Sequence, residues 1–373
     1  MGTTAQDEQG YWSGVEQWLA SVVPQRWKTQ RAALTPREET EIRRSWDRAL
    51  YAGGFSMLSL PREFGGQGLG LAEEVLFHEL AARAHAPDGL ARIGKILTAP
   101  ALIKHGTEEQ KARFLPRIVS GEDVWCQGFS EPGSGSDLAS VTCSARRVDG
   151  GYRVTGQKVW TSYAEDAHRC LLLARTDDTA PRYRNLSLLL ADMSQPGITI
   201  STLKQISGSM HFAEVFFDDV FVADADRLGD EGEGWHVAMT VLTAERGGVE
   251  AVTRYVDMRA DADRLLTCCT VGTTAEAVAA DFDVEVELVR RQVAKAVSRE
   301  DDPIAFARAT CGLKVQWSEL WARLVEVGLT SGCREHRDHW QFQYLEVRGC
   351  QIYSGTSQIQ RNIIAELVLW MPK

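Results

Sequence analysis

The segment of the chain with the most chemical potential is a glycine-rich run from Gln127 to Asp137, which reads Gln-Gly-Phe-Ser-Glu-Pro-Gly-Ser-Gly-Ser-Asp. Its glycines would let the backbone approach a flat ring or a phosphate closely, because they carry no Cβ. Its hydroxyls and free amides could pair with the polar rim of such a ring. A flexible surface loop has the same composition, so the run alone leaves both interpretations open.

Two further segments could complete a binding site. Trp160-Thr161-Ser162 has strand spacing, so the tryptophan could cover a ring face and a hydroxyl could bond the ring edge, although a core tryptophan would also fit. Residues 353–361 read Tyr-Ser-Gly-Thr-Ser-Gln-Ile-Gln-Arg. A Gly-Thr turn that opens a helix is a ready anion site, suited to a pyrophosphate, and plain helix capping is the alternative.

A second glycine-rich run, residues 65–70, does not match G-x-G-x-x-G and no βαβ unit surrounds it. It predicts a turn before a helix that starts at Leu71.

Composition narrows the class of protein. The 373 residues predict two or three domains, and the net charge of −10 disfavours nucleic acid and anionic lipid as partners. No secretory signal and no membrane-spanning run are visible. The eight cysteines form no C-x-x-C pair, and Cys268 and Cys269 are too close for an ordinary disulfide. We therefore expect reduced thiols, a cytoplasmic protein and no metal site.

The periodicity of apolar residues divides the chain into three parts. Residues 1–120 predict helices, with capping patterns at Thr35 and Thr107. Residues 121–228 predict short strands with turns between them, typical of a small barrel or sandwich. Residues 229–373 predict helices again, over 235–256, 283–300, 313–329 and 352–371. The expected domains are thus an N-terminal helical domain, a central β domain and a C-terminal helical domain.

These segments, in this order, resemble the acyl-CoA dehydrogenase family over nearly the whole chain. Supporting motifs stand at residues 61–66 (Pro-x-x-Phe-Gly-Gly), 105–111, 212–220, 234–235 (Gly-Trp) and 242–246 (Leu-Thr-Ala-Glu-Arg). The resemblance implies an N-terminal α-helical domain, a central β-barrel or sandwich, and a C-terminal four-helix bundle. It also implies that the chain is a flavoprotein oxidoreductase with FAD as cofactor.

The resemblance implies an FAD site built from three segments. Ser130 matches a residue that bonds the pyrimidine edge of the flavin, and Ser136 matches one that also touches the acyl-CoA. The family's Trp-x-Thr motif is matched with Ser162 in place of threonine, so the hydroxyl is kept. The expected FAD contacts are Gln127, Phe129, Ser130, Ser136, Trp160, Thr161, Ser162, Thr356 and Gln358.

The catalytic base is expected to differ from that of many members. Those carry Tyr-Glu-Gly-Thr near the C-terminus, and this Glu removes the α-proton; here the position is Ser354, which cannot do so unaided. A subset places the base on the helix after the β domain, where Glu245 matches. A solvated or ion-paired helix Glu is the alternative for Glu245. Residues expected at the substrate are Ser136, Arg246, Ser354 and Gly355.

The implied reaction is α,β-dehydrogenation of an acyl thioester, carried by CoA or by an acyl-carrier protein. Glu245 takes the α-proton, the β-hydride goes to flavin N5, and donors near Ser354 and Gly355 stabilise the thioester oxygen. Electrons pass to an electron-transferring flavoprotein or another acceptor. A homodimer or homotetramer is expected, although residues 265–281 and 328–340 lack family segments that bind a neighbour's FAD. The alternatives are a monooxygenase of the same fold and a non-catalytic subunit of a heteromeric dehydrogenase.

Overall fold

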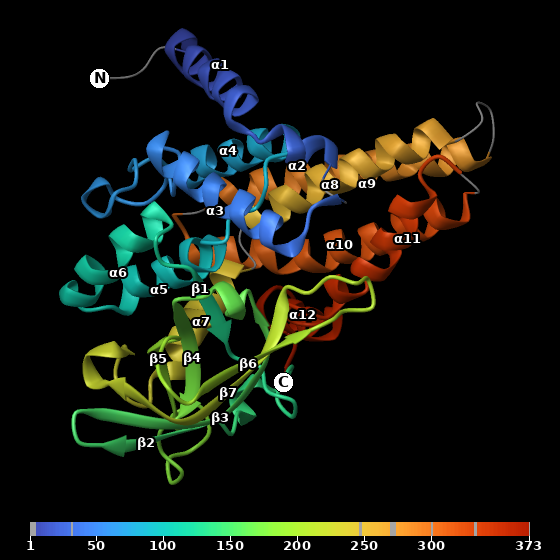
Figure 1. The fold of residues 1–373 in the computed structure, drawn as a ribbon. Coiled ribbons are helices and arrows are strands. Elements are labelled where there is room, and N and C mark those ends of the chain that lie inside the picture. The colour runs from blue at the N-terminus through green and yellow to red at the C-terminus, as the bar shows by residue number, and fades with distance from the viewer. Residues whose placement is uncertain are drawn as a thin grey trace. The chain divides into compact units, whose positions relative to one another are not determined.

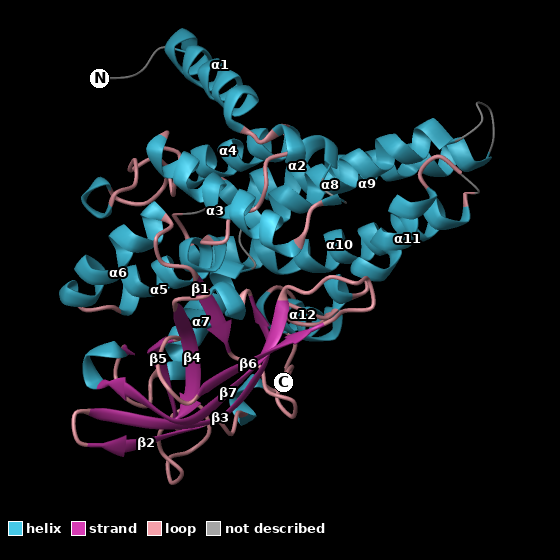
Figure 2. Cartoon of the chain, in the orientation of Figure 1, coloured by secondary structure: helices cyan, strands magenta, loops and turns pink. Residues whose placement is uncertain are grey.

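The computed structural model describes residues 5–30, 33–245, 248–268, 274–299, 301–331 and 334–372. These residues form two compact units (Figure 1). The helical unit comprises the described parts of 1–34, 69–87 and 246–373. The sheet unit comprises 35–68 and 88–245, and it holds all the described strands (Figure 2).

The sheet unit is built on one eight-stranded sheet in the order β6-β7-β3-β2-β4-β5-β8, with β1 added in parallel to β4. The two apolar runs that the sequence marks as strands, β4 and β5, are buried along nearly their whole length, because both faces of the sheet are covered there. The bounds are β1 (Trp125–Gly128), β2 (Ser144–Val148), β3 (Gly151–Ser162), β4 (Arg169–Arg175), β5 (Leu186–Asp192), β6 (Ile198–Leu203), β7 (Phe212–Ala223) and β8 (Arg227–Leu228).

The helices of the sheet unit include α3 (Pro36–Ala52), α5 (Ala99–His105), α6 (Glu108–Ser120) and α7 (Gly234–Glu245). Both predicted capping boxes are confirmed: the Thr35 and Thr107 hydroxyls accept from the backbone N–H three residues on. Helix α7 buries Val237 and Val241 in the apolar cluster that contains the β5 leucines, so the sheet fixes this helix.

The helical unit contains α1 (Ala5–Val22), α2 (Gln25–Gln30), α4 (Leu71–Arg83), α8 (Gly248–Cys268), α9 (Thr274–Val297), α10 (Pro303–Thr330), α11 (Arg337–Glu346) and α12 (Ser357–Leu367). Helices α8, α9 and α10 pack side by side around one apolar core, and α11 and α12 pack on α10 (Figure 1). The predicted order of helices, then strands, then helices is therefore confirmed.

The structure departs from two expectations. The helix predicted over 352–371 begins only at Ser357, because Ser354 and Gly355 adopt left-handed backbone angles that a helix does not allow. Cys268 is disulfide-bonded, so the expectation of a reduced thiol is wrong at this residue; Cys269 lies outside the described residues. The described residues of the helix predicted over 235–256 lie in α7 and α8; residues 246 and 247, the first of which is Arg246, lie outside the described residues.

No described helix has the length and apolar character needed to cross a membrane.

A buried carboxylate ties three helices of the helical unit together. Asp261 of α8 accepts a hydrogen bond from Trp321 Nε1 at 2.9 Å and one from Arg264 at 2.7 Å, and His339 Nε2 lies 2.7 Å from its Oδ1. Its side chain is buried, so each lost bond leaves a polar group without water to replace it.

We expect Asp261→Asn to lower the free energy of unfolding by about 3 kcal/mol, because the amide cannot accept from all these donors and removes the buried charge. Asp263→Asn is the matched control, since Asp263 is an exposed partner of Arg259 on the same helix and should change stability by less than about 0.5 kcal/mol. Urea unfolding measures both. Equal effects of the two substitutions would contradict the role given to Asp261.

Candidate functional site

The glycine-rich run follows directly from strand β1. Gly128 is the last residue of β1, and its backbone packs closely against β4: a Cβ at this position would lie 2.8 Å from Cys170 Sγ. The backbones of Glu131 and Ser134 exchange two hydrogen bonds, at 3.0 and 3.1 Å, and close a tight turn. No atom of the described chain lies within 4 Å of where a Cβ would stand at Gly133 or Gly135, so this part of the run faces open space.

A buried ion pair supports the run from the inside of the sheet. Lys158 of β3 is completely buried, and its Nζ donates to Glu131 Oε1 at 2.9 Å and to the Phe129 carbonyl at 3.0 Å. Glu131 also accepts from the Thr142 N–H and hydroxyl and from the Cys143 N–H, at 2.7–2.8 Å. Both oxygens of the Glu131 carboxylate therefore have hydrogen-bond donors.

The same network sets the charge of Glu131. Burial by itself would raise the pKa of this carboxyl, but the Lys158 ammonium and the amide donors outweigh burial and lower the pKa below its usual value. Glu131 is therefore a structural anion under ordinary conditions, and it holds the run in one conformation.

Trp160 lies next to the run. The Val159 N–H donates to the Ser130 carbonyl at 2.9 Å, which joins β3 to the run one residue before the tryptophan. Trp160 is 57% exposed, with a φ of 60°, and Phe212 meets its ring edge-on, at 5.8 Å between ring centroids. A large apolar side chain held exposed on a strained backbone is a mark of a binding surface.

The neighbours of Trp160 point in different directions. Thr161 is fully buried, and its hydroxyl has no partner among the described residues. Ser162 is half-buried. The pairing of β3 with β7 is irregular between Lys158 and Thr161, where Trp160 has its left-handed φ, and regular pairing resumes at Thr161 and Ser162, whose side chains therefore point to opposite faces of the strand.

In the helical unit, the predicted C-terminal segment forms a turn in front of α12. Ser354 and Gly355 have φ values of 54° and 84°, and the Thr356 hydroxyl caps the helix by accepting from the Ile359 N–H at 3.2 Å. Gln358 is exposed on the first turn of the helix. The unsatisfied N–H groups of this first turn make an anion-binding end.

The structure therefore groups the predicted residues in two places. Gln127, Phe129 and Ser130 lie beside Trp160, Thr161 and Ser162 in the sheet unit, where Phe129 is buried and Gln127 and Ser130 are half-buried. Ser136 is exposed further along the run. Ser354, Gly355, Thr356 and Gln358 form the turn in the helical unit.

Glu245 is the last residue of α7 in the sheet unit and is half-buried. Helix α7 is tied to α5 by a 2.8 Å hydrogen bond between Thr240 and His105, which steadies the helix that carries Glu245. Arg246, the other residue expected near the reaction, lies outside the described residues.

Sequence reasoning missed the residues that support these segments. Lys158 behind the run, and Lys314 and Gln360 behind the turn, are buried and donate to backbone carbonyls of the predicted site segments; Glu131, within the run, is buried and accepts from Lys158 and from the Thr142 N–H. One signal could have found the first pair: a lysine and a glutamate at strand and loop positions that are otherwise apolar or small. The partner of each could not be read, because the two lie 27 residues apart.

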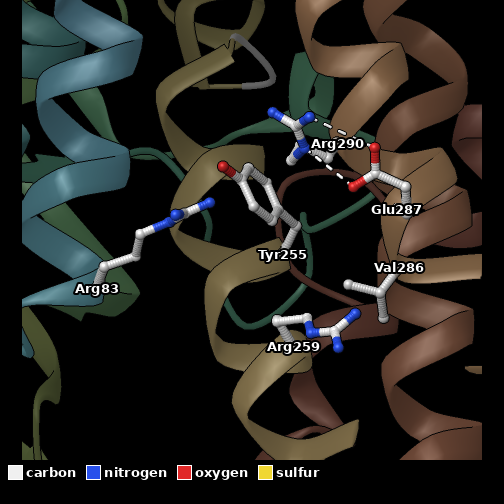
Figure 3. A pocket seen from close by; sticks show the side chains of 6 residues that line it. All are labelled: Arg83, Tyr255, Arg259, Val286, Glu287 and Arg290. Carbon is white, nitrogen blue, oxygen red and sulfur yellow. Dashed lines mark hydrogen bonds and ion pairs between the residues drawn. The ribbon is translucent and has the colours of Figure 1, made fainter. Parts of the chain in front are cut away.

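A cavity of about 400 Å³ lies elsewhere in the helical unit, between α4, α8 and α9 (Figure 3). Three arginines surround it, but each pairs with a carboxylate: Arg83 with Glu79, Arg290 with Glu287, and Arg259 with Asp263 and Asp283. The four carboxylates offset the three guanidinium charges. The cavity therefore lacks the net positive charge of an anion site.

Known proteins match this chain over nearly its whole length. Three family models match: the acyl-CoA dehydrogenase N-terminal domain at residues 9–122, the middle domain at 126–220 and the C-terminal domain at 232–369. The acyl-CoA dehydrogenase IpdE1 of Mycobacterium tuberculosis is 38% identical over 392 aligned residues, covering 99% of each chain.

Two solved structures have the same fold. The steroid ACAD Tcur3481-Tcur3483 has a TM-score of 0.82 at 22% identity, with 100% of both chains covered. The ChsE4-ChsE5 complex from Mycobacterium tuberculosis has a TM-score of 0.83 at 23% identity, covering 100% of this chain and 99% of that one.

Proposed function

The chain belongs to the acyl-CoA dehydrogenase family, and from this premise we propose that it oxidises an acyl-CoA to the 2,3-enoyl-CoA with Glu245 as the base. Members of this family are FAD-dependent flavoproteins that act on the CH–CH bond of acyl-CoA. The observation that carries the proposal is Trp160, exposed on a left-handed backbone beside a glycine-rich run that faces open space.

The residues present fit FAD. The open run and the exposed indole suit a flat ring, and the half-buried Ser162 offers a hydroxyl two residues after the indole. The turn before α12 suits a pyrophosphate. We assign Gln127, Ser130, Trp160 and Ser162 to the flavin side and Thr356 and Gln358 to the ADP side; Phe129 and Thr161, whose side chains are buried, would contribute backbone groups.

When bound, FAD supplies the acceptor for the β-hydrogen of the substrate, which leaves with its electron pair. The chain supplies the proton acceptor and the donors. Glu245, as a carboxylate, would take the α-proton, and the amides of the Ser354–Gly355 turn would donate to the thioester oxygen as negative charge develops there. Ser136 and Arg246 would contact the substrate outside the reacting carbons.

Anaerobic flavin bleaching tests this function directly. A panel of acyl-CoA thioesters is added to the purified holoprotein without oxygen, and the visible absorbance of oxidised flavin is followed. At least one thioester is expected to bleach the flavin. Repeating the bleaching test with the same acyl group on an acyl-carrier protein shows whether the chain uses CoA or the carrier protein. No bleaching by any thioester, together with oxygen-dependent turnover, would favour the monooxygenase alternative.

A second candidate rests on Ser354, which leaves the C-terminal motif without an acidic residue. The ChsE4-ChsE5 complex, of the same fold, is an assembly of two different chains. If this chain is instead the non-catalytic member of such a pair, it would retain FAD poorly when purified alone, and Glu245→Gln would not change the activity of the pair. Electron-transferring flavoprotein remains the proposed acceptor in either case.

We expect Trp160→Gly to weaken FAD binding about tenfold or more while changing the free energy of unfolding by less than about 1 kcal/mol. Glycine relieves the left-handed φ, which offsets the lost contact with Phe212. FAD titration and urea unfolding measure the two effects. Trp370→Gly is the matched control, because Trp370 is also exposed with a φ of 56° but lies outside the proposed site. Equal loss of FAD in both variants would count against a flavin role for Trp160.

A further inference from the structure

Two buried side chains hold the turn in front of α12 from behind. Lys314, on α10, is 2% exposed, and its Nζ donates to the Gly355 carbonyl at 2.7 Å. Gln360, on α12, is fully buried, and its Nε2 donates to the Ser354 carbonyl at 2.8 Å. Both carbonyls of the turn therefore point into the helical unit.

The direction of the carbonyls fixes the direction of two N–H groups. A trans peptide is planar, with its C=O and N–H on opposite sides, and no cis peptide occurs among the described residues. The Ser354 carbonyl shares its plane with the Gly355 N–H, and the Gly355 carbonyl shares its plane with the Thr356 N–H. These two N–H groups consequently point away from Gln360 and Lys314.

The turn would not hold this shape unaided. A left-handed φ is unfavourable for a serine, so Ser354 needs outside contacts to keep it. Gly355 is also confined, because a Cβ at this position would lie 2.8 Å from Gln360 Nε2. The hydrogen bond from an ammonium polarises the peptide and makes the Thr356 N–H a stronger donor. The positive end of the α12 dipole acts in the same direction.

We propose that Lys314 is a positioning residue, which aims the Gly355 and Thr356 N–H groups at an anionic oxygen in front of the turn. The identity of that oxygen rests on the proposed function: it is the pyrophosphate of FAD or the thioester oxygen of the substrate. Lys314 itself touches neither, because it lies behind the peptide planes that it orients.

The choice of lysine is itself informative. Burying an ammonium costs desolvation free energy, so a lysine is an unfavourable choice at a position that only needs to be filled. Methionine has the length of lysine without the charge or the donor. If Lys314 only filled space between α10 and α12, methionine would serve as well.

The test compares Lys314→Met with Glu319→Gln. Glu319 pairs with Arg361 across the same two helices, at 2.7 and 2.9 Å on the surface, so its loss loosens the same packing without touching the turn. Lys314→Met is expected to lower the free energy of unfolding, because the Gly355 carbonyl loses its buried donor, and to raise the FAD dissociation constant about tenfold, measured by titrating the apoprotein with FAD. Glu319→Gln should leave it unchanged.

The two candidate oxygens give different results. Weaker FAD binding with kcat preserved at saturating FAD identifies the pyrophosphate, and unchanged FAD binding with a lower kcat identifies the thioester oxygen. The proposal is overturned if Lys314→Met keeps both the FAD dissociation constant and kcat within twofold of wild type. It is also overturned if the losses in Lys314→Met equal those in Glu319→Gln. Should Lys314→Met not fold, Gln360→Met takes its place, because it removes the donor to the Ser354 carbonyl. Its FAD dissociation constant and kcat are compared with wild type and with Glu319→Gln in the same way.

Failure of this inference and failure of the proposed function can be told apart. FAD titration requires no turnover, so it judges the pyrophosphate role of Lys314 even if no acyl-CoA bleaches the wild-type flavin. Conversely, a wild-type protein that bleaches with an acyl-CoA keeps the proposed function whatever Lys314→Met does.

Discussion

Glu245→Gln is expected to lower kcat by about 10³-fold while leaving FAD bound. Glutamine has nearly the shape of glutamate, but its amide cannot accept the α-proton, and positioned general bases contribute about 10²–10⁴-fold. Removal of the α-proton is the step for which the rest of the proposed site offers no replacement, since residue 354, which the resemblance matches to the acid of many members, is a serine. Stopped-flow anaerobic reduction of the flavin by acyl-CoA measures this step without interference from the electron acceptor.

The matched control is Glu233→Gln. Glu233 precedes α7 immediately and pairs with Arg184 at 3.6 Å, so the same chemical change is made at the other end of the helix that carries Glu245. Its rate should stay within about twofold of wild type, because exposed ion pairs contribute little. If Glu245→Gln reduces the flavin as fast as Glu233→Gln does, the base is another residue or belongs to another chain.

Much of the fold could be predicted because its signals are local. The capping boxes at Thr35 and Thr107 depend on residues three positions apart, and the apolar runs of β4 and β5 reflect burial on both faces. The turn at Ser354 could not be predicted. The apolar and polar residues of 352–371 alternate as in one helix, and the backbone departs from it through contacts made by Lys314, 41 residues away from Gly355.

The candidate site likewise has one part that local sequence patterns indicate and another part that only the folded structure shows. Residue types at short spacing, such as the glycines of 127–137 and Trp160, indicate where a flat ligand could lie. The residues that hold those segments in place, Glu131 with Lys158 and Lys314 with Gln360, act through hydrogen bonds to backbone atoms. Such bonds depend on the folded geometry and leave almost no trace in the sequence.

Lys158→Met is expected to lower the free energy of unfolding by about 3–5 kcal/mol, the cost of leaving a buried carboxylate without its charge partner. The double variant Lys158→Met/Glu131→Gln should lose less than Lys158→Met alone, because the uncompensated charge is gone as well. Urea unfolding of the two variants and wild type gives the comparison. A double variant no more stable than Lys158→Met would show that the pair is not coupled in this way.

The dependence of stability on pH provides an independent check of the Glu131–Lys158 pair. The pKa of Glu131 is lowered in the folded chain from an ordinary value of 4.5, so its ionised form is stabilised by folding. That contribution is fully present above pH 4.5 and is lost as the pH falls through the lower pKa of the folded state. The advantage of wild type over Lys158→Met/Glu131→Gln, measured by urea unfolding at about pH 7 and at about pH 3, should therefore shrink in acid. Because the double variant keeps every other carboxylate, any acid loss shared by both proteins cancels in the difference. A constant advantage across this range would mean that Glu131 is not held as an anion by Lys158, and the support for the glycine-rich run would then have to come from hydrogen bonds alone.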